Sequence, residues 1–222
     1  MPNPQRKPYK GIGMEGRLAG WYAKNTGKDL SPFRGLAARI SERVPKGGAI
    51  LEVAPGPGYL AVELARLGRY RVIGLDVSHS FVEIAAENAR KAGVQAEFRV
   101  GDAAAMPFAD GMFDFVVCRA ALKNFSAPVD ALREMRRVLK PGGEALVIDM
   151  HRDVTNEEID SAVRAMPLSA FDRLITKATF KYMLRPRAYT LDAFRAMAAE
   201  AGFSGCTIET DSIGFEATLQ KA

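Results

Sequence analysis

The sequence has 222 residues, of which 48% are hydrophobic and 26% are charged. This composition is typical of a folded globular protein and excludes a disordered or fibrous chain. Lys and Arg exceed Asp and Glu by 31 to 26, but the net charge of +5 is spread along the chain and does not indicate nucleic-acid binding. No apolar run is long enough for a membrane span or a secretory signal, so we expect a cytoplasmic protein without membrane association.

The two cysteines, Cys118 and Cys206, lie far apart and have no His or Cys neighbours at metal-ligand spacing. Neither a metal site nor a disulfide framework is therefore expected. The sequence does not indicate an oligomeric state.

Residues 1–30 predict an arm that lies outside the main core. Pro and Gly are frequent in its first thirteen residues, and the following segment predicts a short helix over 14–25. Ser31 followed by Pro32 is typical of an N-cap and a helix start, and apolar residues then recur at helical spacing up to Pro45.

Residues 45–150 alternate between strand and helix signals. We expect strands at 49–53, 71–75, 96–100, 114–118 and 144–150. The first intervening helix ends at Gly68, and the second begins after Ser78 as its N-cap and ends at Gly93. A third helix over 127–139 ends at the segment Pro141-Gly142-Gly143. Nearly continuous apolar strands indicate a parallel sheet that is covered by helices on both faces.

The alternation stops after Met150. Residues 151–189 are helical, aromatic and basic, which predicts a lid insertion, and residues 190–222 predict a helix and a terminal hairpin with a turn near Ile213. The expected fold of residues 1–222 is a single α/β domain. It contains a doubly wound, mostly parallel seven-stranded sheet with an antiparallel C-terminal strand and a helical lid.

Three segments at the ends of predicted strands indicate a nucleoside-containing ligand. The turn from Glu52 to Gly58 contains glycines that allow close approach of a ligand, and the next helix starts there with free N–H groups. Asp76 ends the second strand, where a carboxylate can accept hydrogen bonds from both ribose hydroxyls. The alternative, that Asp76 caps the following helix, is less favoured because Ser78 is better placed to do so. Asp102 ends the third strand and could accept a hydrogen bond from an exocyclic amine such as that of adenine.

Four motifs carry a family resemblance by their order and spacing: ILEVAPGPGYLAVELA, VIGLDVS, VGDAAAMPFADGMFDFVVC and RVLKPGG. They resemble class I S-adenosylmethionine-dependent methyltransferases, particularly the small-molecule group similar to the ubiquinone/menaquinone biosynthesis methyltransferases. The resemblance covers residues 45–150. It implies a Rossmann-like fold and S-adenosylmethionine as the cofactor.

The resemblance also implies roles for individual residues. Glu52 and the loop of Ala54, Gly56 and Gly58 hold the methionine portion, and Asp76 binds the ribose. Val77 packs on the adenine, Asp102 and Ala103 read its edge, and Arg119 faces the methionine amine. The chain departs from the family pattern at two positions, since Glu52 stands where Asp is usual and Ala54 where Gly is usual.

The acceptor is expected near the carboxyl ends of the fourth and fifth strands, which form the crevice of an open α/β sheet. Asn124 could orient a nucleophile there or cap the next helix. His151 could act as a general base or be an exposed loop residue, whereas His79 is expected at the surface. The expected substrate contacts are Trp21, Tyr22, Lys123, Tyr182, Arg185 and Tyr189.

The predicted function is methyl transfer from S-adenosylmethionine to a small, planar or aromatic acceptor by in-line displacement. We do not expect a nucleic-acid acceptor, because the Asn-Pro-Pro-aromatic motif of many base methyltransferases is missing after the fourth strand. Two alternatives stay open. The glycine loop also fits an NAD-dependent oxidoreductase, although a Tyr-x-x-x-Lys pair is missing, and the chain could be a non-catalytic cofactor-binding protein that acts through a partner.

Overall fold

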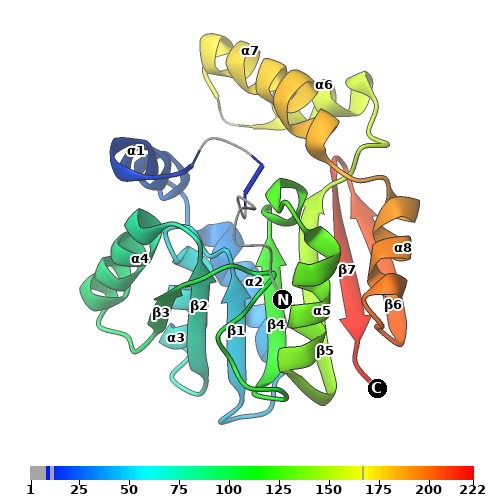
Figure 1. The fold of residues 1–222 in the computed structure, drawn as a ribbon. Helices are drawn as coiled ribbons and strands as arrows, with labels where there is room; N and C mark the ends of the chain where they lie inside the picture. Colours follow the sequence, from blue (N-terminus) through cyan, green and yellow to red (C-terminus); the bar gives the residue numbers. More distant parts are fainter. Residues whose placement is uncertain (1–8, 11–12, 167) are drawn as a thin grey trace.

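The computed structural model describes residues 9–10, 13–166 and 168–222. A seven-stranded sheet of order β3-β2-β1-β4-β5-β7-β6 forms the centre of the molecule (Figure 1). The strands are β1 (Ala49–Val53), β2 (Arg71–Asp76), β3 (Glu97–Val100), β4 (Phe113–Arg119), β5 (Leu139–Met150), β6 (Gly205–Asp211) and β7 (Gly214–Gln220). The first five are parallel, β7 runs antiparallel to β5, and β6 runs antiparallel to β7. The predicted fold class is confirmed.

Helices connect most of the parallel strands, and further helices form the insertion of residues 151–189 that was predicted to be a lid. They are α1 (Gly16–Thr26), α2 (Ser31–Ser41), α3 (Tyr59–Arg66), α4 (His79–Ala92), α5 (Pro128–Val138), α6 (Asn156–Ala165), α7 (Ala170–Ala178) and α8 (Leu191–Glu200). Shorter turns are the 3₁₀ segments η1 (Leu122–Asn124) and η3 (Arg185–Arg187) and the π-helical segment η2 (Thr179–Leu184). Among the described helices none is long and apolar enough to cross a bilayer.

Local chemistry explains most of the helix ends. The Ser78 hydroxyl accepts the N–H of Phe81 at 3.0 Å and caps α4, whose C-cap Gly93 has φ +67°. Both predicted caps are confirmed. The predicted N-cap at Ser31 is wrong by one residue, because its N–H donates to Asp29 and Leu30 becomes the N-cap of α2.

One strand begins earlier than expected. The segment Pro141-Gly142-Gly143 was predicted to lie before the fifth strand, but β5 starts at Leu139, which pairs with Phe113. The next printed pair is Phe115 with Glu144, so the intervening residues of β5 form an irregularity in the ladder. The expectation failed because Leu139 is fully buried, and its contacts hold this segment against β4.

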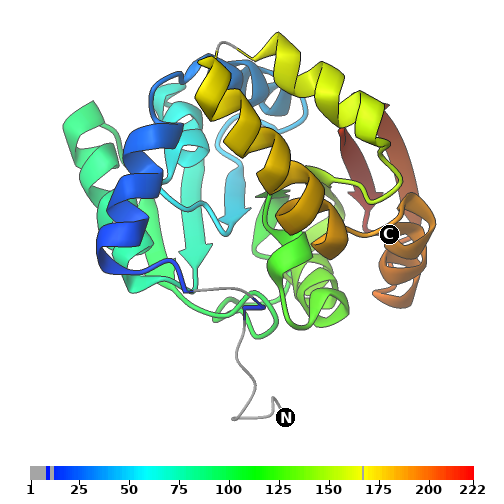
Figure 2. The same ribbon diagram turned by 90° about the horizontal axis from the view of Figure 1, so that it is seen from above.

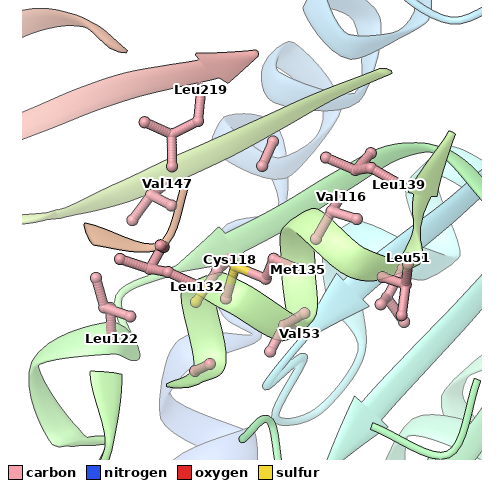
Figure 3. Packing of buried hydrophobic residues seen from close by; sticks show 14 of the residues in the cluster. Leu51, Val53, Val116, Cys118, Leu122, Leu132, Met135, Leu139, Val147 and Leu219 are labelled. Carbon is pink, nitrogen blue, oxygen red and sulfur yellow. The ribbon is translucent and has the colours of Figure 1, made fainter. Parts of the chain in front are cut away.

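The sheet is buried on both faces, and the alternation of strand side chains divides the core. In β1, Ile50 packs with α2 and α3, whereas Leu51 points to the cluster that contains Leu132 and Met135 of α5. Figure 2 shows α2 and α3 on one side of the sheet and α5 and α8 on the other. Figure 3 shows the second cluster, in which Leu132 and Met135 pack among strand residues that include Val53, Val116 and Val147.

The helices of the insertion lie above the carboxyl ends of the strands (Figure 1). Figure 1 shows α6 and α7 over this edge and α1 beside the start of α4. A small cluster around Met150, Val154, Ile159 and Val163 fastens the insertion to β5. The outer elements leave large apolar side chains exposed: Leu18, Trp21, Tyr22, Phe171, Leu174, Ile175, Tyr182 and Met183.

Candidate functional site

The loop between β1 and α3 requires left-handed backbone at three positions. Ala54, Gly56 and Gly58 have φ of +56°, +54° and +76°. A Cβ on Gly58 would lie 2.7 Å from the Cβ of Ala85 and 3.0 Å from the ring of Phe98, so packing against α4 and β3 requires glycine here. A Cβ on Gly56 would meet no atom of the described residues within 4 Å. The backbone of Gly56 is therefore open to a ligand.

Asp76 lies beside this open backbone at the end of β2. One carboxylate oxygen accepts the N–H of Gly56 and the other accepts the N–H of Ser78, both at 2.9 Å. Burial raises the pKa of Asp76, and these backbone hydrogen bonds lower it in part. A carboxylate has about four lone-pair sites, so Asp76 keeps capacity to accept from a ligand donor. The alternative that Asp76 caps α4 is wrong, because the Ser78 side chain fills that role.

Glu52 is a second buried carboxylate at the same edge. Its Oε2 accepts the N–H of Ala61 at 2.8 Å, within the first turn of α3. Burial raises the pKa of Glu52 to about 8, although Ala61 and the charge of Arg119 act in the opposite direction. The Arg119 guanidinium lies 4.8 Å from the centroid of the Phe33 ring, and its positive charge acts on Glu52.

The adenine side of the predicted site lies next to Asp76. The N–H of Gly101 donates to the Asp76 carbonyl at 2.9 Å, which brings the end of β3 to the end of β2. A carboxylate oxygen of Asp102 accepts the N–H of Ala104 at 2.9 Å, and Ala103 is half-buried. Val77 is 39% exposed, so its side chain is accessible to a ring.

Lys123 occupies a different place from the one expected. Its side chain is buried, and the amine donates to a carboxylate oxygen of Asp149 at 2.6 Å and to the carbonyl of Ala120 at 2.8 Å. Asp149, which sequence analysis missed, is a carboxylate within the apolar run of β5, and that contrast was the available signal. This geometry favours an internal role for Lys123 over direct substrate contact.

Asn124 and His151 follow β4 and β5. The capping role for Asn124 is wrong, because α5 begins at Pro128 after Ala127 and has no side-chain cap. His151 is only 8% exposed, so the alternative of an exposed loop histidine is also wrong. Its Nδ1 is buried and has no hydrogen-bond partner among the described residues. His79 is exposed at the start of α4, as predicted.

Two of the expected substrate contacts, Tyr189 and Tyr22, touch other elements of the fold, whereas the hydrogen bonds that Arg185 makes among the described residues lie within the insertion. Tyr189 lies beside His151 through a backbone bridge, and its hydroxyl accepts a hydrogen bond from the Lys10 amine at 2.9 Å. Tyr22 packs edge-on against Phe81 of α4, with ring centroids 5.7 Å apart. By contrast, Arg185 donates to the carbonyl of Val154 and to the side chain of Asn156, which are contacts within the insertion.

The remaining two expected contacts lie on the outer surface. Trp21 is 65% exposed and Tyr182 is 78% exposed. In this structure both side chains are largely exposed to solvent.

Sequence analysis also missed Tyr9. Its backbone forms an antiparallel bridge with Phe125, directly after η1, and the N–H of Lys10 donates to the Asn124 carbonyl at 2.8 Å. Burial raises the pKa of the Tyr9 phenol, and the charge of Arg187 lowers it. The only available signal was the aromatic residue within the basic segment 6–10, which resembles a solvated charge cluster.

Comparison with known proteins places this site in a family. The family described as "Methyltransferase domain" matches residues 51–147. The ubiquinone/menaquinone biosynthesis C-methyltransferase UbiE of Pseudomonas entomophila is 32% identical over 187 residues, covering 78% of this chain and 72% of the relative. The demethylmenaquinone methyltransferase of Chlorobaculum parvum is 33% identical over 168 residues, covering 73% of this chain and 67% of the relative.

Solved structures share the fold at lower identity. A protein of Methanococcus maripaludis that is assigned as an S-adenosyl-L-methionine-dependent methyltransferase aligns with a TM-score of 0.72 at 21% identity, covering 100% of this chain and 97% of the other. A SAM-dependent methyltransferase of Aquifex aeolicus aligns with a TM-score of 0.65 at 17% identity, covering 87% of this chain and 99% of the other.

These matches contradict both alternatives, the NAD-dependent oxidoreductase and the non-catalytic binding protein. The chain belongs to the S-adenosylmethionine-dependent methyltransferases, in the group that is similar to the ubiquinone/menaquinone biosynthesis enzymes.

Proposed function

We propose that this methyltransferase acts on a small, planar or aromatic acceptor that binds at the carboxyl ends of β4 and β5. The observation that carries the proposal is the buried imidazole of His151, whose Nδ1 has no partner among the described residues. Buried polar groups are normally hydrogen-bonded, and an exception calls for a functional explanation.

The residues of the glycine loop fit the cofactor. The diol of the ribose can donate to the remaining lone pairs of Asp76. The open space beside Gly56 allows the ligand to approach the backbone of this residue closely. Glu52 is an acceptor for the methionine amine. Arg119 was expected to face that amine, but its positive charge suits the carboxylate of the same amino-acid portion better. When bound, S-adenosylmethionine supplies an electrophilic methyl group on a sulfonium.

His151 is proposed as the general base for an acceptor that must lose a proton. A hydroxyl or a carbon acid needs such a base, whereas a neutral amine or a thiolate needs only orientation. Hydrogen bonds from the N–H and the hydroxyl of Thr155 mainly lower the pKa of Glu158 in the first turn of α6, and the charge of His151 acts weakly in the same direction. The Glu158 carboxylate is therefore a counter-charge near a protonated imidazole. Asn124 is proposed to orient the acceptor, since its side chain does not cap α5.

The lid supports an acceptor that is partly apolar. Phe171, Leu174 and Ile175 lie on α7 and are all exposed, which leaves an apolar surface on the element above the strand ends (Figures 1 and 2). The names of the relatives refer to ubiquinone and menaquinone biosynthesis and to methylation at carbon. Both observations support a small cyclic acceptor with an acidic carbon or hydroxyl.

The test is a panel of quinols, phenols, amines and thiols in which release of S-adenosylhomocysteine is measured. On a quinol or phenol, His151→Ala should lower kcat by about 10²-fold with unchanged affinity for S-adenosylhomocysteine, as expected for the loss of a general base. His79→Ala is the matched control, because that histidine is exposed at the start of α4, and its kcat should stay at the wild-type value.

Two results would contradict the proposal. An unchanged rate for His151→Ala on the best protic acceptor would remove His151 from the chemistry. Methylation of tRNA or DNA that collapses between low and moderate salt, with no turnover of the small-molecule panel, would show that the acceptor class is wrong.

A further inference from the structure

Lys123 and Asp149 form an ion pair that is nearly closed to solvent. The amine lies 2.6 Å from a carboxylate oxygen, and the side chains are 6% and 3% exposed. Removing two such charges from water is costly, and apolar residues of similar volume often give equal or greater stability. Stability alone therefore does not explain why these two charges lie here.

The pair connects the ends of two strands. The Lys123 N–H donates to one Asp149 oxygen at 3.2 Å, while the other oxygen accepts the Lys123 amine and the N–H of Met150 at 2.8 Å. The Lys123 amine also donates to the carbonyl of Ala120. In this way the turn after β4 is tied to the last residues of β5 by side-chain bonds in addition to the ladder.

The backbone that the pair holds is strained. Ala120 has φ +58°, a left-handed conformation that a residue with a Cβ rarely adopts. Such backbone persists only where the surrounding contacts determine it, and it is frequent at functional sites. Here the Ala120 N–H donates to the Ile148 carbonyl at 2.7 Å, and its carbonyl accepts the Lys123 amine.

The two residues that are proposed to act on the methyl acceptor lie next to this ion pair in the sequence. Asn124 follows Lys123 in η1, and His151 lies two residues after Asp149. A change in the distance between the turn and the end of β5 would therefore change the distance between the two groups that act on the acceptor.

We propose that Lys123 and Asp149 are a positioning pair that sets the place of Asn124 relative to His151 for methyl transfer. This inference rests on the acceptor site described under the proposed function. Neither residue is assigned a contact with the substrate or the cofactor; both act through the backbone that they hold.

The central experiment replaces the pair by apolar residues of similar size, Lys123→Met together with Asp149→Leu. Without a buried charge on either side, the double variant should fold and bind S-adenosylhomocysteine with the wild-type Kd. Its kcat on the best acceptor should fall by about 10- to 100-fold, because small displacements of reacting groups reduce rates by this order. Hydrogen exchange in residues 119–125 should become faster, whichever acceptor the enzyme uses.

The matched control is Lys140→Met. Lys140 pairs with Asp114 at 2.8 Å between β4 and β5, but at the opposite end of these strands and with the lysine 45% exposed. This variant should keep the wild-type kcat and the wild-type exchange in 119–125.

A second variant keeps the test decisive if the double variant does not fold. Asp149→Asn preserves the side-chain volume but removes one of the two accepting oxygens, so either the Lys123 N–H or its amine loses a partner. Faster exchange in 119–125 and a lower kcat at unchanged cofactor affinity are expected.

Wild-type kcat and wild-type exchange in either folded variant would overturn the positioning role and leave a purely structural pair. That outcome differs from failure of the proposed function, which would appear as a wild-type enzyme that turns over no panel acceptor. If no panel acceptor is turned over, hydrogen exchange in residues 119–125 alone still decides whether the ion pair stabilises the turn after β4.

Discussion

Replacement of Gly58 by alanine tests whether the cofactor loop depends on close packing. The new Cβ would lie 2.7 Å from the Cβ of Ala85, at a φ of +76°. Left-handed backbone costs an alanine about 1–2 kcal/mol, and overpacking adds about 1–3 kcal/mol. The smaller entropy of the unfolded alanine chain offsets roughly 0.4–1 kcal/mol. The expected loss of unfolding free energy is about 1–5 kcal/mol, or roughly 2–20 °C in Tm for a chain of this size.

Gly56→Ala is the matched comparison in the same loop. Its φ of +54° carries a similar strain, but the added Cβ meets no atom within 4 Å in the part of the chain that the structure describes. The unfolding free energy should therefore fall by only about 1 kcal/mol, which is the strain less the entropy gain. Because the methyl group enters the space proposed for the cofactor, the Kd of S-adenosylhomocysteine should rise by about 10-fold, equal to about 1.4 kcal/mol.

Urea unfolding of both variants gives the unfolding free energy, and calorimetry gives the Kd of S-adenosylhomocysteine. Equal destabilisation by the two substitutions would refute the packing argument for Gly58. Wild-type affinity in Gly56→Ala would show that the open space over this glycine does not receive the cofactor.

Four further outcomes are expected. Asp76→Ala should weaken binding of S-adenosylhomocysteine by about 1.5–3 kcal/mol in calorimetry, because charge-assisted bonds to the ribose are lost; an unchanged Kd would contradict the ribose assignment. Burial raises the pKa of Glu52 from 4.5 to about 8, so its contribution to stability is full below pH 4.5 and is lost as the pH rises through 8. Glu52→Gln should therefore reduce the decline of the urea midpoint between pH 4.5 and 8. If the urea midpoint of the variant declines with pH as steeply as that of the wild type, other groups cause the decline. Ala54→Gly should raise the unfolding free energy by up to about 1 kcal/mol, since φ +56° favours glycine; a lower urea midpoint would count against strain at this position. Hydrogen exchange of 16–26 and 156–187 should slow when S-adenosylhomocysteine and an acceptor bind, whereas equal exchange in both states would contradict a lid.

Local patterns in the sequence were sufficient for the framework of the cofactor side. The Ser78 cap, the Gly93 C-cap and the strand that ends at Asp76 depend on residues only a few positions apart. Helix caps and strand ends depend on interactions between residues that are close in sequence, so residue type and periodicity were enough to predict them. The order of the motifs likewise indicated the family, because each motif is a continuous segment of the sequence.

The acceptor side depended on contacts between distant residues. Lys123 pairs with Asp149, 26 positions away, and Lys10 reaches Tyr189 across 179 positions. A lysine after a strand has the same local sequence whether its amine faces water or a buried carboxylate, and its burial depends on which strand lies beside it in the sheet. The sequence by itself determined the family and the approximate positions of the core strands and helices. Only the tertiary structure decided the start of β5 and the partners of these charged side chains, since burial and pairing arise from packing between segments.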